Sequence, residues 1–331
     1  MMRQASQREL QGGRGALLKL LACPNCHGGL HREGDKCECR TCGRIYADRD
    51  GIPVFVAENA AVHDELDHLA GDSRHDHGGP GTAHKVTQAA FFDRAALAEF
   101  EIERPEGSPP LYRFLLTEKF RRSVEPLGGR LDGWTALTVC GGSGMDAEFL
   151  ADAGAAVISS DLSLGAASRV RERARRHGIQ IEPIVADVER LPFADRSVDL
   201  VYVHDGLHHL EDPFSGISEM ARVARRAVCI TEPARATVTT IGVRLGIALD
   251  REEAGNRVAR LEPAAVASSL QAAGFHVVRA DRYAMYYHHE PGRLTALLSR
   301  QLLLASTIRG WRLANRIVGR VGNKLTIVAV R

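Results

Sequence analysis

The sequence predicts an α/β protein in which helices cover both faces of a parallel sheet, with a small cysteine-rich β unit ahead of it. From Ala136 onward, short continuous apolar runs alternate with helical patterns, which is typical of buried parallel strands joined by helices. Five of the seven cysteines fall between Cys23 and Cys42, which sets the first part of the chain apart. A hydrophobic content of 44% is sufficient for a packed core.

Seven strands and the helices between them can be placed from these patterns. The expected strands are Ala136–Val139, Ala155–Ser160, Ile181–Ala186, Val198–His204, Ala227–Glu232, Phe275–Ala280 and Lys324–Val330. The expected helices are Met145–Ala153, Ala166–His177, Phe214–Val223 and Pro263–Ala273, preceded by helical patterns at Thr87–Glu103 and Pro110–Val124.

Composition divides the chain into segments. We expect a disordered N-terminus (1–19), a cysteine-rich unit (20–57), a linker rich in Gly, His and Asp (58–86) and a large domain (87–331) with a helical insert at 290–322. No run of about 18 apolar residues occurs, so we expect no stable membrane insertion and a cytoplasmic location. The net charge is only +2, but residues 291–331 contain eight Lys or Arg and no Asp or Glu.

The cysteine spacing predicts a zinc site. Cys23 and Cys26 form one C-x-x-C pair, and Cys39 and Cys42 form a second one twelve residues later. Two such turns supply the four thiolates of a tetrahedral zinc ion. Cys37 is an extra thiol, but only Cys39 has C-x-x-C spacing to Cys42. A site with four protein ligands has no open position, so the expected zinc is structural.

The residues around the second pair carry a resemblance. The segment Cys39-Arg-Thr-Cys42-Gly-Arg-Ile-Tyr46, followed by Asp50-Gly-Ile-Pro-Val54, resembles the small zinc-ribbon proteins that activate methyltransferases acting on tRNA, rRNA and release factors. The resemblance covers about 35 residues and implies a zinc ribbon, here fused to a larger domain.

A glycine-rich turn and an acid after it predict a nucleotide-type cofactor site. Cys140-Gly141-Gly142-Ser143-Gly144 follows the first strand and opens a helix, which lets a ligand approach the backbone. Asp161 ends the next strand, where a carboxylate accepts hydrogen bonds from ribose hydroxyls. These two features alone suit a nicotinamide dinucleotide equally well.

The later motifs favour a different cofactor. Asp187 follows the third strand within Ala186-Asp-Val-Glu-Arg-Leu-Pro-Phe193, and His208-His-Leu-Glu-Asp-Pro213 follows the fourth. In this order they resemble the class I S-adenosylmethionine-dependent methyltransferases, in particular the branch that acts on small molecules. The resemblance covers roughly residues 130–235 and implies a Rossmann-like seven-stranded sheet with S-adenosylmethionine as cofactor.

The resemblance also implies which residues bind this cofactor. The glycine-rich turn would hold the methionine part, the acid after the second strand the ribose, and the acid after the third strand the adenine amine. The expected contacts are Cys140, Gly141, Gly142, Gly144, Asp161, Leu162, Asp187, Val188, His204 and Tyr112. For Tyr112 the alternative is an aromatic side chain of the helix face that packs in the core. Two positions depart from the family pattern: Thr138 stands where an acid is usual, and Cys140 stands where the first glycine is usual. These departures leave open whether cofactor use is altered.

Candidate catalytic residues lie where the fourth strand ends. His204 and His208 are the expected proton acceptors, since imidazole titrates near neutrality; bracing of the loop is the alternative for His208. Glu232, at the end of the fifth strand, is a further candidate, with capping as its alternative. A cluster after the sixth strand would line a pocket or fill a core; its members are Tyr283, Tyr286, Tyr287, His288 and His289.

The insert bears on the choice of substrate. Leu294, Leu297, Leu298 and Leu302 recur at helical spacing and are expected to pack inward. Arg309, Arg312, Arg316 and Arg320 would line one helix face, as a solvated surface or as a site for RNA, an anionic substrate or a membrane surface. The predicted function is methyl transfer to a small molecule, and the alternative is an rRNA or tRNA base methyltransferase. The acceptor atom and the oligomeric state stay open, and a homo-oligomer is compatible with the sequence.

Overall fold

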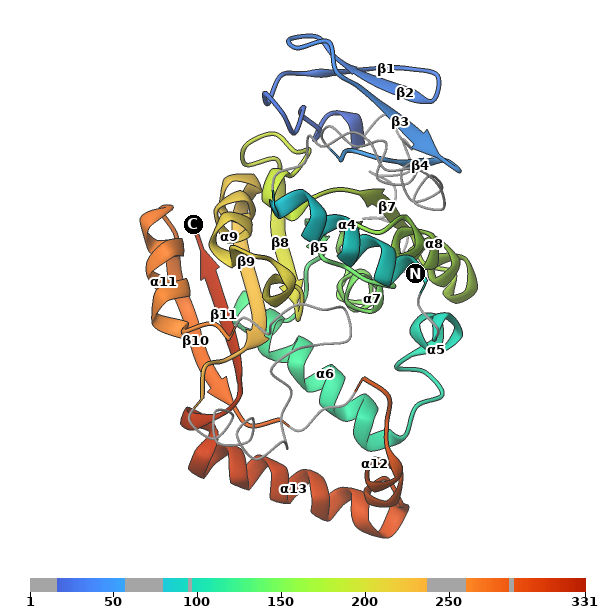
Figure 1. Ribbon diagram of the computed structural model, residues 1–331. Coiled ribbons are helices and arrows are strands. Elements are labelled where there is room, and N and C mark those ends of the chain that lie inside the picture. The colour runs from blue at the N-terminus through green and yellow to red at the C-terminus, as the bar shows by residue number, and fades with distance from the viewer. Residues whose placement is uncertain (1–16, 57–79, 95–96, 237–259, 286–288) are drawn as a thin grey trace.

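The computed structural model describes residues 17–56, 80–94, 97–236, 260–285 and 289–331. The expected N-terminal segment up to residue 16, most of the expected linker, and Tyr286, Tyr287 and His288 lie outside the described residues. Figure 1 shows a small antiparallel sheet at the top, the large sheet with its helices in the middle, and a long helix, α13, along the bottom.

The large sheet has seven strands in the order β10-β11-β9-β8-β5-β6-β7, which confirms the predicted α/β class. Its strands are β5 (Thr135–Val139), β6 (Ala156–Asp161), β7 (Ile181–Val185), β8 (Val198–His204), β9 (Ala224–Pro233), β10 (His276–Tyr283) and β11 (Lys324–Val330). Strands β5 to β9 pair in parallel, whereas β11 is antiparallel to both β9 and β10. The sheet is therefore mixed where the sequence pattern indicated a parallel one.

Helices lie on both faces of the sheet (Figure 1). They are α4 (Pro80–Asp93), α5 (Ala98–Glu103), α6 (Pro110–Val124), α7 (Met145–Asp152), α8 (Leu164–His177), α9 (Pro213–Val223) and α11 (Pro263–Ala272). Several helix starts carry a cap: Ser163 accepts from the Ala166 N–H before α8, and Asp212 accepts from the Phe214 N–H before α9. Helix α4 begins at Pro80, inside the segment that the composition indicated to be linker.

The N-terminal sheet has four short strands: β1 (Leu30–Glu33), β2 (Lys36–Cys39), β3 (Ile45–Arg49) and β4 (Ile52–Pro53). It is attached to the large sheet through backbone bonds. Val54 forms a parallel bridge with Val185 of β7, and Phe55 N–H donates to the Val185 carbonyl oxygen at 2.7 Å. At the other side, the Ala22 N–H donates to the Pro192 carbonyl oxygen at 3.1 Å. The small sheet thus rests on β7 and on the loop that follows it.

The insert forms two helices, α12 (Arg293–Leu298) and α13 (Gln301–Val318), but their leucines do not all pack inward as expected. Leu298 contacts the core, whereas Leu294 and Leu297 are exposed and Leu302 is 92% exposed. For Leu302 the reason is a break at Arg300, whose extended backbone (φ −62°, ψ 142°) resets the helical phase. Leu302 therefore lies on the outer face of a new helix.

Candidate functional site

The glycine-rich turn between β5 and α7 brings backbone close to a neighbouring strand and leaves space on its other side. A Cβ atom added to Gly141 would lie 2.4 Å from the Ser159 Oγ of β6, so only glycine fits there. A Cβ on Gly142 would meet no atom within 4 Å. Gly144 lies directly before α7 and has φ +82°. A Cβ atom added to it would lie 3.1 Å from the Val170 side chain. The turn therefore leaves open space beside the partly buried backbone of Gly142, where a ligand can approach closely.

Asp161 lies at the end of β6 and faces this turn. Its Oδ2 accepts from the Gly142 N–H at 2.9 Å, and its Oδ1 accepts from the Ser163 N–H at 2.9 Å. Burial raises the pKa of this carboxyl, although the two N–H donors act in the opposite direction. Because a carboxylate has about four lone-pair sites, each oxygen can still accept from a ligand hydroxyl. Leu162 follows directly and is partly buried.

Asp187 follows β7 and is already held by two donors. Its Oδ1 accepts from the Glu189 N–H at 2.9 Å, and its Oδ2 lies 2.6 Å from the Lys85 Nζ of α4. Lys85 also contacts the Glu189 carboxylate, and these negative charges raise the pKa of Lys85 against the effect of burial. Lys85 was not singled out from the sequence, because it lies in the segment that the composition indicated to be linker. Val188 is buried beside Asp187 in the core.

Helix α4 closes over the same edge of the sheet. The Asp93 carboxylate accepts from the Ser163 hydroxyl at 2.6 Å and from the Gly165 N–H at 2.7 Å. Arg169 of α8 donates to the Phe92 carbonyl oxygen at 2.8 Å and to the Ser143 hydroxyl at 2.9 Å. The helix therefore connects the loop after Asp161 to the glycine-rich turn.

Tyr112 of α6 is buried, and its hydroxyl donates to the His289 carbonyl oxygen at 2.7 Å. His289 in turn contacts the Glu101 carboxylate of α5. This arrangement ties α6 to the segment after β10.

His204 lies at the end of β8 among charged groups. Its Nδ1 is 3.0 Å from the Asp146 Oδ1 of α7, and its Nε2 is 3.3 Å from the Asp205 Oδ2. Burial lowers the pKa of His204, but Asp146 and Asp205 outweigh it, despite the opposing charge of Lys119, so the net shift is upward. The Nε2 atom is buried and makes no well-aligned hydrogen bond within the part of the chain that the structure describes.

Two lysines that the sequence did not single out hold Asp205. The Lys119 Nζ of α6 lies 2.8 Å from Oδ2, and the Lys324 Nζ of β11 lies 2.5 Å from Oδ1. Burial would raise the pKa of Asp205, but the two ammonium groups hold it well below its usual range. Three elements far apart in sequence thus meet at the carboxyl end of β8. Sequence spacing carries no signal for such a pairing.

His208 and Glu232 hold the loop after β8. The Glu232 Oε1 accepts from the Gly206 and Leu207 N–H groups at 2.8 and 2.7 Å, and Oε2 lies 2.8 Å from the His208 Nδ1. Both side chains are buried. Donor atoms of Asp205, His208 and Glu232 all lie within 4.8 Å of one another, but the lysines on Asp205 already supply positive charge there. The geometry assigns this group to loop support rather than to metal binding.

The four predicted zinc ligands meet at one point of the small sheet. The thiol sulfurs of Cys23, Cys26, Cys39 and Cys42 all lie within 4.8 Å of one another. The Cys26–Cys39 and Cys23–Cys42 sulfurs are 3.4 and 3.7 Å apart. A tetrahedral zinc with Zn–S bonds of ~2.3 Å requires sulfurs about 3.8 Å apart, so the donor set fits this ion.

Two further residues of the small sheet, Cys37 and Gly28, lie near the four cysteines without belonging to the group. Cys37 lies outside this group of four, and burial raises the pKa of its thiol. A Cβ on Gly28 would come 2.2 Å from the Thr41 Oγ1, so glycine is needed where the two cysteine turns approach.

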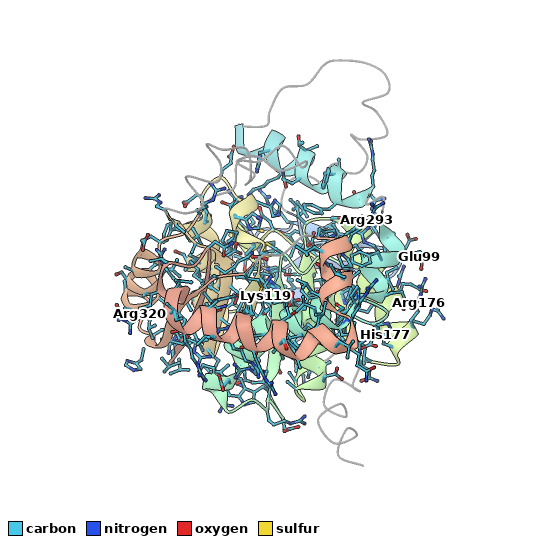
Figure 2. The ribbon with its side chains drawn as sticks, turned by 90° about the horizontal axis from the view of Figure 1, so that it is seen from below. Glu99, Lys119, Arg176, His177, Arg293 and Arg320 are labelled. Atoms are coloured by element: carbon cyan, nitrogen blue, oxygen red, sulfur yellow. The ribbon has the colours of Figure 1, made fainter. Side chains whose placement is uncertain are left out.

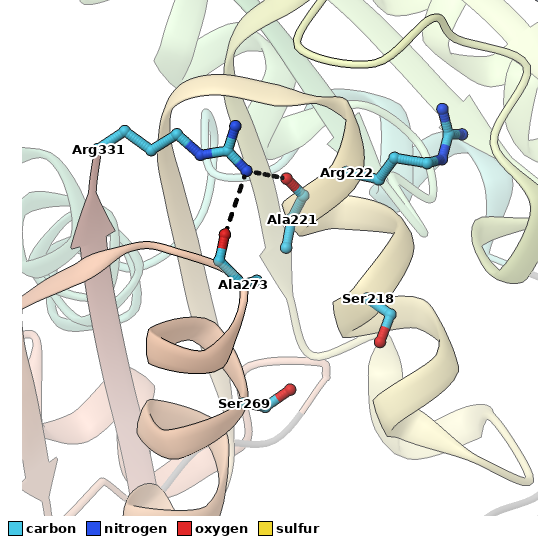
Figure 3. A pocket seen from close by; sticks show the side chains of 6 residues that line it. All are labelled: Ser218, Ala221, Arg222, Ser269, Ala273 and Arg331. Atoms are coloured by element: carbon cyan, nitrogen blue, oxygen red, sulfur yellow. Dashed lines mark hydrogen bonds between the residues drawn. The ribbon is translucent and has the colours of Figure 1, made fainter.

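Of the two described members of the aromatic cluster, Tyr283 belongs to the core, whereas the His289 side chain is 55% exposed. Tyr283 is fully buried, and the Arg122 guanidinium lies 4.6 Å above its ring. A separate cavity of about 250 Å³ lies between α9 and α11, where Figure 3 shows Arg331 donating to the carbonyl oxygens of Ala221 and Ala273. It lies near the start of β9, at the opposite end of the sheet from Asp161 and His204.

Comparison with known proteins agrees with this geometry. Residues 137–229 match the family model of a methyltransferase domain. The chain is similar to demethylmenaquinone methyltransferases from Renibacterium salmoninarum (38% identical over 109 residues) and Beutenbergia cavernae (38% over 105 residues). These matches cover 33% and 32% of this chain and only 44% and 42% of the relatives' own lengths.

The fold is also similar to that of a solved structure. Magnesium protoporphyrin IX methyltransferase from Synechocystis, with bound S-adenosylhomocysteine, superposes with a TM-score of 0.52 and 17% identity, over 75% of this chain and 99% of that one. At this identity the likeness concerns the fold alone. Residues 137–229 thus match a methyltransferase-domain model, and the chain shares the fold of a solved methyltransferase.

Proposed function

We propose that the protein is an S-adenosylmethionine-dependent methyltransferase that acts on a small molecule. The observation that carries the proposal is the pair formed by the glycine-rich turn and Asp161. The Asp161 carboxylate is partly buried, bonded to the Gly142 N–H at 2.9 Å, and located beside the open space at Gly142. The match of residues 137–229 to a methyltransferase domain supports the same cofactor.

Each of the residues around this space has a proposed task in binding. Asp161 accepts hydrogen bonds from the ribose hydroxyls, and the backbone of the glycine-rich turn approaches the methionine part. Asp187, whose Oδ2 accepts from the Lys85 ammonium, also accepts from the adenine amine. Tyr112 orders the wall formed by α6 through its bond to the His289 carbonyl oxygen.

When bound, this cofactor supplies a methyl group on a sulfonium, whose leaving group is neutral. The residues of the chain then mainly have to position the acceptor and exclude water. A proton must also be removed when the acceptor is a weakly acidic O–H or C–H group. We propose His204 for this task, because Asp146 orients its ring and raises its basicity. His208, bonded to Glu232 below the loop, is proposed to position that loop.

The small-molecule acceptor is supported by the relatives, which are named demethylmenaquinone methyltransferases. A quinone-like ring is therefore the first acceptor class to test. RNA stays the alternative, since six arginines of the insert are exposed and available to phosphates.

The cysteine-rich unit is proposed to be a zinc ribbon that supports the cofactor loop. Its buried residues Leu21 and Phe55 share one core with Leu191 and Phe193, which follow Asp187 in the chain. Zinc would keep this unit folded and thereby fix the loop that carries Asp187.

Asp161→Asn provides the test of cofactor binding. The amide keeps the volume of the side chain but removes one acceptor oxygen, so we expect at least about tenfold weaker binding of S-adenosylmethionine by calorimetry. Asp195→Asn, at a side chain that is 73% exposed, is the matched control and should bind as the parent protein does. Equal affinity of Asp161→Asn and the parent would refute the assigned site.

The acceptor is tested by supplying cofactor with a labelled methyl group together with quinone-like small molecules or bulk RNA. Label in the small molecules supports the proposal. Label in the RNA alone would favour the alternative.

A further inference from the structure

Helices α12 and α13 carry an unusual share of the exposed apolar surface. Thirteen large hydrophobic side chains are exposed among the described residues, and eight of them lie between Leu294 and Val321. These eight are Leu294, Leu297, Leu302, Leu303, Leu313, Ile317, Val318 and Val321. Such a concentration on one segment marks an interaction surface rather than scattered exposure.

The inner face of α13 is firmly attached to the domain. Leu304, Ile308 and Trp311 pack against the core formed with α6, and the Trp311 Nε1 donates to the Ala284 carbonyl oxygen at 3.1 Å. Asn315 bonds the backbone of Ala284 in both directions, at 2.8 and 3.0 Å. The helix is therefore fixed without any contribution from its outer face.

The outer face combines leucines and arginines. Leu302, Leu313 and Ile317 are 92%, 57% and 72% exposed and recur at spacings of eleven and four residues, which returns them to the same side of a helix. Arg309 and Arg316 fall on the flank of this apolar stripe. Figure 2 shows α13 from below, lying in front across the middle of this side, with Arg320 near one end and Arg293 at α12.

The charges of this surface are unopposed. Six of its side chains are exposed arginines: Arg293, Arg300, Arg309, Arg312, Arg316 and Arg320. Residues 291–331 contain no Asp or Glu, and within the described residues these six arginines form no ion pair. Arg312 instead lies over the Phe114 ring at 5.4 Å. An anionic partner is the complement of such a surface.

We propose that the outer face of α12 and α13 binds the surface of an anionic lipid bilayer. Aliphatic side chains bordered by arginines fit the boundary between lipid headgroups and acyl chains, where both kinds of side chain are stabilised. RNA would match the arginines, but it would leave three exposed aliphatic side chains unburied, and the outer face of α13 carries no aromatic ring for bases to stack on. This surface is separate from the cofactor site, so the inference stands without the proposed methyl transfer.

The test is flotation of the full chain with vesicles of phosphatidylcholine alone or of phosphatidylcholine with about a third phosphatidylglycerol. We expect binding to the anionic vesicles, weakening as salt is raised, and little binding to the neutral ones. Arg309→Gln with Arg316→Gln should weaken binding about 25-fold, since each basic residue near an anionic surface contributes roughly fivefold. Arg190→Gln with Arg196→Gln removes the same charge from exposed sites elsewhere and should leave binding unchanged.

The apolar contribution is tested with Leu302→Ser and Leu313→Ser together. Both side chains are exposed, so thermal unfolding should be unchanged while vesicle binding falls about tenfold or more. Equal loss of binding in the control arginine pair, or salt-sensitive binding to bulk RNA without vesicle binding, would overturn the proposal. So would a lipid-free oligomer that the leucine substitutions dissociate, because that face would then join two copies of the chain.

Discussion

At the residue scale, Cys140 occupies a backbone conformation that favours glycine. Its φ is +50°, in the left-handed region, and the resemblance to class I methyltransferases implies that glycine is usual at this position. The neighbouring loop is adapted to the side chain, because a Cβ on Gly206 would come 2.3 Å from the Cys140 Cβ. Burial raises the pKa of the thiol well above its usual value, and nearby carboxylates such as Asp161 add to this. Such an upward shift favours the neutral thiol over the thiolate.

We predict that Cys140→Gly is more stable than Cys140→Ala by about 1 kcal/mol in free energy of unfolding, because both remove the sulfur but only alanine keeps a Cβ in a left-handed conformation. The difference is measured by urea denaturation of the two variants. If alanine proved as stable as glycine, the positive φ at this position would not carry the expected cost.

At the same scale, His204 is expected to make the stability of the folded protein depend on pH. Its pKa is raised in the folded protein by Asp146 and Asp205, and a raised histidine pKa adds stability that is complete below the unfolded value of about 6.5. That contribution is lost as pH rises through the folded pKa. Asp146→Asn removes the principal cause of the shift.

We therefore expect Asp146→Asn to lose more stability relative to the parent at about pH 5.5 than at about pH 9. The His204 resonance should also titrate at lower pH in the variant, as NMR can follow. Asp195→Asn, at an exposed carboxylate, is the control with the same chemical change. A loss of the same size at both pH values would show that Asp146 does not act through His204.

At the scale of elements, the sequence predicted correctly the strands and helices whose own residues carry the full hydrophobic pattern of the element. Val198–His204, Lys324–Val330 and Pro110–Val124 were expected with the bounds that the structure shows. A buried strand or a helix that begins with proline carries its own signal in hydrophobicity and breaker residues. The expected helix at Thr87–Glu103 is instead two helices, α4 and α5.

The parts that were not predictable depend on contacts between distant segments. A heptad-like run of leucines does not reveal that the backbone breaks at Arg300, and this break decides that Leu302 faces outward. Strand β11 lies between β9 and β10 and is antiparallel to both, and the hydrophobic pattern of the strand itself does not indicate this direction.

At the site, the glycine-rich turn and Asp161 were predictable because the motif spans few residues. The ion pair of Lys85 with Asp187 joins residues 102 positions apart, and that of Lys119 with Asp205 joins residues 86 positions apart. Only the fold brings them together.

At the scale of the whole molecule, the small sheet and the large sheet share one hydrophobic core. Buried residues of the N-terminal part, including Leu17, Leu21, Tyr46 and Phe55, belong to the same cluster as Leu137, Val201 and Ile230 of the central strands. The far end of the molecule carries α13 (Figure 1), so the cysteine-rich sheet and α13 lie at opposite ends of the structure. Within the described residues, no helix is both long and apolar enough to cross a bilayer.

A shared core implies that zinc stabilises the entire chain and not only its ribbon. We expect a single cooperative thermal transition for the zinc-loaded protein, shifted down by roughly 5 °C or more after chelation, since a loss of ~2 kcal/mol lowers Tm by about 4–8 °C in a domain of this size. Cys39→Ser with Cys42→Ser should reproduce the shift and abolish the binding of about one zinc per chain. Cys37→Ala, at a buried thiol outside the four ligands, should keep the metal and serves as the control. Two separate transitions, of which chelation moved only the smaller, would instead show that the ribbon folds independently and leaves the loop after β7 unsupported by zinc.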